Sequence, residues 1–147
     1  MKKKTVIFDL DGTLADIDVR RDKSLKPNGK LDWNIFASPK SILDWDKPNL
    51  PVIKMAQMFK ADGFKVVIFS GRNDRGFFAT KKWLADNDVP FDLLVLRPDK
   101  FKADSWPIAD GNPATPDMRF MPDDILKKKM LDTFVDINDV FVVVDDR

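Results

Sequence analysis

The arrangement of four short apolar runs along this 147-residue chain is the feature that most constrains its fold. The runs are residues 5–9 (TVIFD), 65–69 (KVVIF), 92–96 (DLLVL) and 140–144 (VFVVV). Each is nearly continuous in apolar side chains, a pattern typical of strands that are buried on both faces. Because helical patterns separate the runs, the sequence predicts an α/β fold with an open, three-layer, Rossmann-like parallel sheet.

Three segments between the runs carry helix signals. The first spans residues 51–63, with proline in its first turn and glycine at its end. The second spans residues 75–88, and we expect Phe77, Phe78 and Leu84 to face inward. The third follows residues 123–124, two aspartates of which one is expected to cap the helix.

Two longer segments lack such patterns. Residues 15–50 are polar and rich in Pro, Asn, Asp and Lys, so we expect a small cap or flap insertion without regular secondary structure. Residues 97–122 are expected to form a loop that is long for a compact domain, which is typical of a functional lid. We expect both segments to cover a site, and residues 1–147 to form one domain.

Three of the runs end in polar, chemically active side chains: Asp9 with Asp11, Ser70 with Arg72, and Asp145 with Asp146. The carboxyl ends of parallel strands meet at one edge of a sheet, where ligands bind in open α/β folds. Carboxylates packed together repel each other unless a cation or hydrogen bonds compensate them. The sequence therefore predicts a divalent metal at this edge, with chemistry beside it.

The chain contains neither cysteine nor histidine. This composition excludes Ser-His-Asp triads, thiolate nucleophiles, histidine general bases and most transition-metal sites. Catalysis must then use carboxylates, Lys, Arg, hydroxyls and a hard cation. The net charge of +1 creates no global field that attracts nucleic acid or membrane. No apolar run is long enough to span a bilayer, and we expect a cytoplasmic protein without membrane partners.

The order of these residues resembles the haloacid dehalogenase (HAD) superfamily of phosphotransferases. FDLDGTL at residues 8–14 is followed by SGR at 70–72, a lysine at 127 and the aspartate pair at 145–146. The resemblance covers the whole chain. It implies a HAD-like sheet with strand order 4-1-2-3, numbered along the chain, and a phosphomonoester hydrolase that acts through an aspartyl-phosphate.

The resemblance implies catalytic roles for individual residues. Asp9 would be the nucleophile that attacks phosphorus. Asp11 would protonate the leaving alkoxide and then activate water, with Thr13 orienting it. Lys127 would stabilise the charge of the transition state and restrain Asp9. Ion-pumping ATPases carry threonine at the position of Asp11, so a carboxylate there favours a phosphatase or phosphomutase that turns over quickly.

The resemblance also implies Mg²⁺ as the cofactor. Its ligands would be the Asp9 carboxylate, the Asp11 backbone carbonyl and a carboxylate of Asp145 or Asp146. This set suits Mg²⁺, which prefers one or two carboxylates together with waters and phosphate oxygens.

Phosphate binding is the role that the resemblance implies for a second group of residues. Ser70 and the Gly71 amide would hold the phosphoryl oxygens, and Thr13 would lie among the groups near the phosphate. Arg72 and Arg97 would contact the phosphate or the nucleotide that carries it. For Arg72 a surface salt bridge stays open as the alternative.

A narrower resemblance concerns the phosphatase half of phage polynucleotide kinase/phosphatase. It is carried by four segments: KWL at 82–84, VPFDLLVLRP at 89–98, PDDILK at 122–127 and VVVDDR at 142–147. It implies nucleotides or 3′-phosphorylated nucleic acid ends as substrates. No GxxxxGK[ST] loop is present in the sequence, so we expect no kinase half beside these segments. The family continues beyond the aspartate pair, so we expect either a truncated sequence or an unusually open site.

Several alternatives stay open. One is a phosphatase that acts on small metabolites or 5′-nucleotides, and another is an inactive or truncated HAD-like binding module. A receiver-type phosphoacceptor domain is disfavoured because the third run ends in Leu96-Arg97 rather than in aspartate. Lys127 also suits a solvated helix face. Three tryptophans are of a type that can stack on a nucleobase, but we expect packing roles for them: Trp33, Trp45 and Trp106.

Overall fold

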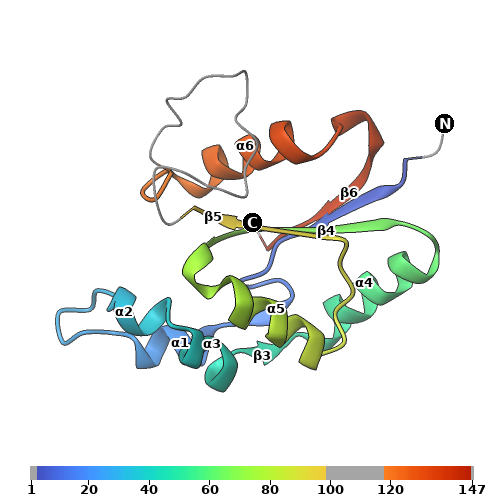
Figure 1. Ribbon diagram of the computed structural model, residues 1–147. Helices are drawn as coiled ribbons and strands as arrows, with labels where there is room; N and C mark the ends of the chain where they lie inside the picture. Colours follow the sequence, from blue (N-terminus) through green and yellow to red (C-terminus); the bar gives the residue numbers. More distant parts are fainter. Residues whose placement is uncertain (1–2, 99–117, 147) are drawn as a thin grey trace.

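The computed structural model describes residues 3–98 and 118–146 of the chain (Figure 1). Four parallel strands form one sheet in the order β5-β4-β1-β6. Their bounds are Thr5–Phe8 for β1, Lys65–Asn73 for β4, Leu93–Arg97 for β5 and Val140–Val144 for β6. These strands correspond to the first, second, third and fourth of the predicted runs, and the predicted parallel sheet is confirmed.

Helices cover both faces of the sheet. They are α4 (Leu50–Ala61), α5 (Phe77–Asp86) and α6 (Asp123–Phe134). Alternate residues of a strand point to opposite faces, so Val6 and Phe8 pack in one core with α4 and α5, whereas Ile7 packs in the other with α6. Figure 1 shows α6 above the sheet and α4 and α5 below it. The three-layer arrangement is therefore confirmed.

Two predicted details of the helices are wrong. Leu84 is buried as expected, but Phe78 is 81% exposed, because α5 begins at Phe77 after a 3-10 turn, η1 (Asp74–Gly76), and its phase turns Trp83 inward instead of Phe78. The N-cap of α6 is Pro122, and neither aspartate that follows caps the helix through its side chain.

The segment at residues 15–50 was expected to be irregular, and this expectation is also wrong. It forms three short helices, α1 (Asp18–Lys23), α2 (Trp33–Phe36) and α3 (Pro39–Trp45), and an antiparallel pair of strands, β2 (Ala15–Asp16) with β3 (Lys47–Pro48). The side chains of Asp32 and Ser38 cap α2 and α3 by accepting backbone N–H groups. Helices this short leave no long apolar periodicity in a sequence.

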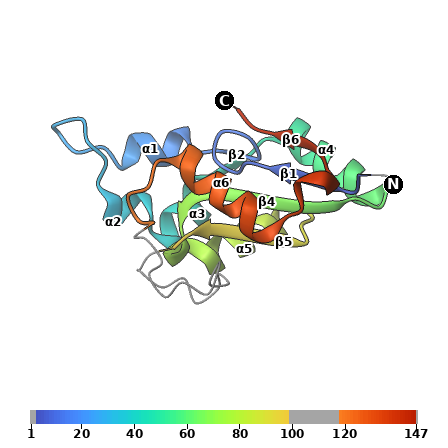
Figure 2. The ribbon, with the colours of Figure 1, turned by 90° about the horizontal axis from the view of Figure 1, so that it is seen from above.

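The insertion lies beyond the carboxyl ends of the strands, as Figures 1 and 2 show for α1 and α2. On the other side of the sheet, Arg97 belongs to β5 and residues 118–122 lead into α6. The remainder of the predicted long loop, including Trp106, lies outside the described residues. A second 3-10 turn, η3 (Ile137–Asp139), precedes β6. In the part of the chain that the structure describes, no helix is long and apolar enough to cross a membrane.

Candidate active site

Asp9, which follows β1 directly, is buried and held from two sides. Its Oδ1 accepts a hydrogen bond of 2.7 Å from Lys127 Nζ of α6, and its Oδ2 accepts one of 3.2 Å from Thr13 Oγ1. Thr13 was expected to orient Asp11, so the structure differs here: the turn after β1 brings the hydroxyl back to Asp9. Its predicted place near the phosphate stays a prediction.

Burial, with a smaller contribution from the neighbouring Asp145 carboxylate, raises the pKa of Asp9 from its ordinary value of 3.8 to about 6, although the Lys127 ammonium opposes both effects. Burial in turn disfavours the charged form of Lys127, but its hydrogen bonds to Asp9 and Asp145 outweigh this effect and raise its pKa. Lys127 therefore forms partly buried ion pairs with Asp9 and Asp145 and does not lie on a solvated face of α6.

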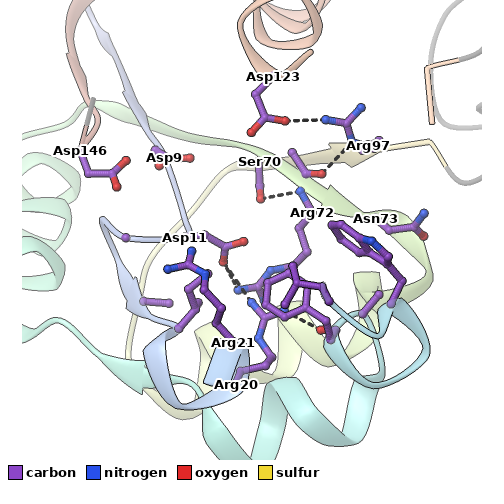
Figure 3. A pocket seen from close by; sticks show the side chains of 18 of the residues that line it. Asp9, Asp11, Arg20, Arg21, Ser70, Arg72, Asn73, Arg97, Asp123 and Asp146 are labelled. Atoms are coloured by element: carbon purple, nitrogen blue, oxygen red, sulfur yellow. Dashed lines mark hydrogen bonds and ion pairs between the residues drawn. The ribbon is translucent and has the colours of Figure 1, made fainter. Parts of the chain in front are cut away.

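Three carboxylates meet beside Asp9. One oxygen each from Asp9, Asp145 and Asp146 lies within 4.8 Å of the others. The two latter residues follow β6, which pairs with β1 in parallel, so the sheet itself brings the carboxylates together. The Asp11 side chain is not in this cluster. Figure 3 shows Asp9 and Asp146 on one side of the site and Asp11 turned toward Arg72.

Gly12 makes this close approach possible. Its φ of +82° lies in the left-handed region, where side chains with a Cβ are strained. A Cβ at this position would lie 2.3 Å from Asp146 Oδ2, closer than real contacts allow. Glycine therefore allows both the turn after β1 and the position of the Asp146 carboxylate.

Asp11 is held by two arginines. Its Oδ1 accepts a short hydrogen bond from Arg72 and lies 3.4 Å from the NH2 nitrogen of Arg20. Partial burial works against its ionisation, but the positive charges of Arg72 and then Arg20 outweigh burial and lower the pKa of Asp11. Arg72 is itself buried, so its salt bridge is not a surface one.

Asp46 joins the two arginines. Its Oδ1 lies 2.7 Å from Arg20 Nε and its Oδ2 lies 3.0 Å from the NH2 nitrogen of Arg72, and the Asp46 side chain is fully buried. Thr80 of α5 accepts a further hydrogen bond of 3.0 Å from Arg72. Arg20 belongs to α1 and Asp46 follows α3. The insertion therefore holds Asp11 in position, directly through Arg20 and indirectly through Asp46. Neither Arg20 nor Asp46 is among the site residues predicted from the sequence.

Ser70 and Gly71 lie on the extension of β4 and line the same cleft. The Ser70 hydroxyl accepts the Arg72 N–H at 3.1 Å, which fixes its orientation. A Cβ on Gly71 would lie 2.6 Å from Asp123 Oδ1, so glycine is needed where α6 approaches β4. Their predicted contacts with phosphoryl oxygens stay a prediction.

Arg97 ties the start of α6 to the sheet. Its Nε donates to the Gly71 carbonyl at 2.9 Å, and its NH2 group donates to Asp123 Oδ1 at 2.5 Å (Figure 3). Its NH1 group donates to the carbonyls of Met118 and Met121, both at 2.7 Å. Arg97 thereby positions α6 and with it Lys127. The pairing explains why Asp123 is not a cap.

These residues line one cleft of about 1380 Å³ at the carboxyl ends of the strands. It contains Asp9, Asp11, Lys127 and the phosphate-binding candidates other than Thr13, and its walls come from the insertion, from β4 and from the segment before α6. Of the predicted site residues, Thr13 and Asp145 alone are not among the lining residues.

Residues 3–147 match the family of the polynucleotide kinase PNKP phosphatase domain. The chain belongs to this family. As a member of the PNKP phosphatase family it is a HAD-type phosphatase, and the resemblance expected from its motifs is confirmed.

Two solved structures are similar to this PNKP-type domain over 99% of its length. A chain of the Pnkp1/Rnl/Hen1 complex is 27% identical with a TM-score of 0.64, and a chain of the Pnkp1/Rnl/Hen1 RNA repair complex is 29% identical with a TM-score of 0.63. This chain covers 40% and 37% of those chains, respectively. It therefore corresponds to less than half of the length of either.

Proposed function

We propose that this domain removes the 3′-phosphate from nucleic acid ends or from nucleotides, through an aspartyl-phosphate on Asp9 and with Mg²⁺ as cofactor. The observation that carries the proposal is the setting of Asp9: a buried carboxylate between the Lys127 ammonium at 2.7 Å and the carboxylates of Asp145 and Asp146. A buried carboxylate that is paired with a cation and backed by two further acids suits a nucleophile beside a metal.

In the first step, an Asp9 carboxylate oxygen attacks phosphorus and forms an O–P bond while the bond from phosphorus to the leaving oxygen breaks. Lys127 offsets the negative charge that develops on the phosphoryl oxygens, and the hydroxyl of Ser70 adds a hydrogen bond. Asp11, protonated in the substrate complex, gives its proton to the leaving oxygen. A bound phosphate dianion favours that protonation, because a nearby negative charge raises the pKa of a carboxyl group.

In the second step, Asp11 accepts a proton from water, whose oxygen attacks phosphorus. The bond from phosphorus to Asp9 breaks, inorganic phosphate leaves, and the Asp9 carboxylate is regenerated. Arg72 and Arg20 keep the Asp11 carboxylate at a fixed position for both transfers, through the contacts already described.

The donor set fits Mg²⁺. Carboxylate oxygens of Asp9, Asp145 and Asp146 lie within 4.8 Å of one another, and hard oxygen ligands of this kind suit the ion. These residues, with the Asp11 carbonyl, would hold it. When bound, Mg²⁺ supplies positive charge to the phosphoryl oxygens.

The substrate class is supported by the family and by the similar chains in an RNA repair complex. Nucleic acid 3′ ends and nucleotides share a phosphate monoester attached to a nucleoside. The cleft is large enough for more than a phosphate group, since pockets for drug-sized ligands measure about 300–1,000 Å³.

A substrate panel tests the proposal. Phosphate release is measured, with Mg²⁺ and with EDTA, on a 3′-phosphorylated oligonucleotide, nucleoside 3′- and 5′-monophosphates and sugar phosphates. We expect Mg²⁺-dependent release that is fastest from the 3′-phosphorylated substrates. If the sugar phosphates or 5′-monophosphates are hydrolysed fastest, the proposed substrate class is wrong.

Asp9→Asn provides the matched test of the chemistry. We expect this variant to be folded and to release no phosphate from any substrate. The control is Asp132→Asn, which removes a carboxylate that pairs with Lys128 on the surface of α6 and should keep wild-type rates.

A further inference from the structure

Two exposed aromatic side chains line the cleft and have no role in the proposed phosphatase chemistry. Trp33 opens α2 and is 60% exposed, and Phe120 precedes α6 and is 86% exposed. Both line the cleft that contains Asp9. In Figure 1, α2 lies below the sheet and the segment before α6 above it, so the two rings come from different walls.

Trp33 is fixed relative to the catalytic carboxylates. The Asp32 side chain caps α2 by accepting the Asn34 N–H at 3.0 Å. The Trp33 ring meets Phe36 edge-on, with ring centres 5.4 Å apart, and the guanidinium of Arg20 lies 4.4 Å from the centre of the Phe36 ring. Arg20 in turn contacts Asp11. A continuous series of contacts therefore holds Trp33 at a set separation from Asp11.

Phe120 lies in a turn that hydrogen bonds from Arg97 hold in place. Arg97 holds the carbonyls of Met118 and Met121 on either side of it, and the guanidinium of Arg119 lies 5.5 Å from the centre of the Phe120 ring. Exposed aromatic rings at fixed positions suit a ligand that has flat faces.

The charged groups around these rings favour a polyanion. More basic than acidic side chains line this part of the cleft, outside the catalytic centre. The basic ones are Arg21, Lys47, Arg75 and Arg119, and the acidic ones are Asp16 and Asp18. Asp18 pairs with Arg21 at 3.7 Å, and both of these side chains are exposed. Basic side chains interleaved with aromatic rings are typical of grooves that bind single-stranded nucleic acid.

We propose that Trp33 is a stacking platform for a base at the 3′ end of a single-stranded nucleic acid, with Phe120 forming the other wall of this base subsite. The proposal rests on the proposed function, because the substrate must carry its phosphate on a nucleoside. Trp33 and Asp9 line the same cleft, so the base would stack on Trp33 while the 3′-phosphate of the same substrate meets Asp9. A sugar phosphate has no aromatic face and would gain nothing from Trp33.

The test compares two substrates that differ only in the base. One is a single-stranded 3′-phosphorylated DNA oligonucleotide, and the other has an abasic residue at its 3′ end. For Trp33→Ala we expect the ratio of kcat/KM on the base-bearing substrate to kcat/KM on the abasic substrate to fall by about 5-fold to 150-fold, mainly through KM. Trp33→Phe, which keeps an aromatic face, should restore much of the ratio, and Phe120→Ala should lower it in the same direction.

The matched control is Phe78→Ala. Phe78 is 81% exposed and contacts Phe77 edge-on at 5.6 Å, as Trp33 contacts Phe36, but it does not line the cleft. Its removal should leave the ratio unchanged. If Trp33→Ala slows both substrates equally, Trp33 only packs α2 and the base subsite is wrong.

A binding measurement separates failure of this proposal from failure of the proposed function. Fluorescence anisotropy with a labelled oligonucleotide that ends in a 3′-hydroxyl reports affinity without turnover. Weaker binding by Trp33→Ala than by wild type supports the subsite even if wild type releases no phosphate from nucleic acid, in which case only the proposed function fails. Equal binding by the two proteins contradicts the base subsite, whatever the rates of hydrolysis.

Discussion

At the scale of single residues, Asp9 gains its properties from opposing neighbours. Burial and the Asp145 carboxylate favour its protonated form, whereas Lys127 favours the ionised form that can attack phosphorus. The contact of Lys127 Nζ with Asp9 Oδ1, at 2.7 Å, is therefore as important for the nucleophile as the position of Asp9 itself.

Replacing Lys127 tests this balance. We predict that Lys127→Ala lowers kcat by about 10²–10³-fold, because a positioned donor to the transition-state charge is lost and Asp9 becomes harder to ionise. Lys128→Ala is the matched control, since Lys128 is the next residue of α6 and pairs only with Asp132 in the described structure. Steady-state kinetics on one substrate check both variants, and a Lys127→Ala rate within a few-fold of wild type would contradict the assigned role.

The pKa of Asp9 predicts a dependence of stability on pH. Its value of about 6 in the folded, metal-free protein lies above the ordinary value of 3.8, so between these pH values the folded state binds more protons than the unfolded state. The contribution of Asp9 to stability is therefore present below about pH 4, is lost as the pH rises to about 6, and is flat above that. Urea denaturation in EDTA at several pH values should show this loss, about 3 kcal/mol, in wild type relative to Asp9→Asn. Parallel curves for the two proteins would show that Asp9 has an ordinary pKa.

At the scale of elements, the insertion and α6 complete a site that the sheet begins. The insertion supplies Arg20 and Asp46 from one side, and α6 supplies Lys127 from the other. Helix α6 is in turn fixed to β5 by the pair of Arg97 with Asp123, at 2.5 Å. The proposed catalytic groups Asp9 and Asp11, which follow β1, therefore depend on both the insertion and α6 for their positions.

Asp46 provides the prediction at this scale. Removing one partner of a buried ion pair leaves an uncompensated charge, so Asp46→Ala should lower the free energy of unfolding by about 3–5 kcal/mol. Asp46→Asn should also slow hydrolysis of alkyl phosphates more than that of p-nitrophenyl phosphate, because the aryl leaving group needs little help from Asp11. Asp44→Asn, which breaks an exposed pair with Lys40, is the control for urea denaturation and for the rate ratio. Equal slowing on both substrates would mean that Asp46 supports the fold and not the position of Asp11.

The sequence was informative wherever a local pattern determines the structure. Continuous apolar runs predicted the four strands, and the parallel sheet then placed Asp9, Ser70 and the final aspartates at one edge. Arg20 and Asp46 could not be found in this way, because they meet only through the packing of short helices and lie 26 residues apart. The cap expected at residues 123–124 failed for the same reason: a contact with Arg97 of β5 decides the role of Asp123.

At the scale of the whole molecule, the acidic cluster joins distant parts of the chain. Asp9 follows the first strand of the sheet and Asp145 and Asp146 follow the last, so a cation held by all three would link both ends of the described chain. Such a ligand binds the folded state and not the unfolded state, and it must stabilise the fold by mass action.

Mg²⁺ should accordingly raise the melting temperature. A concentration 100 times the dissociation constant would add about 2.7 kcal/mol to the free energy of unfolding. We predict that this increase is abolished in Asp146→Asn and retained in Asp132→Asn, whose carboxylate lies on the exposed face of α6. Thermal denaturation followed by circular dichroism measures the shift, and an equal shift in Asp146→Asn and wild type would place the metal elsewhere.

The covalent role of Asp9 is tested most directly by trapping its phosphorylated form. The Asp11→Asn variant lacks the base that activates water, and p-nitrophenyl phosphate needs no acid for its leaving group, so we predict that the phosphoenzyme accumulates when this variant meets the substrate with Mg²⁺. Acid quenching followed by peptide mass spectrometry should then find one phosphoryl group, on Asp9. Release of p-nitrophenol in the first turnover, with Asp9 unmodified at every time point, would contradict the aspartyl-phosphate mechanism.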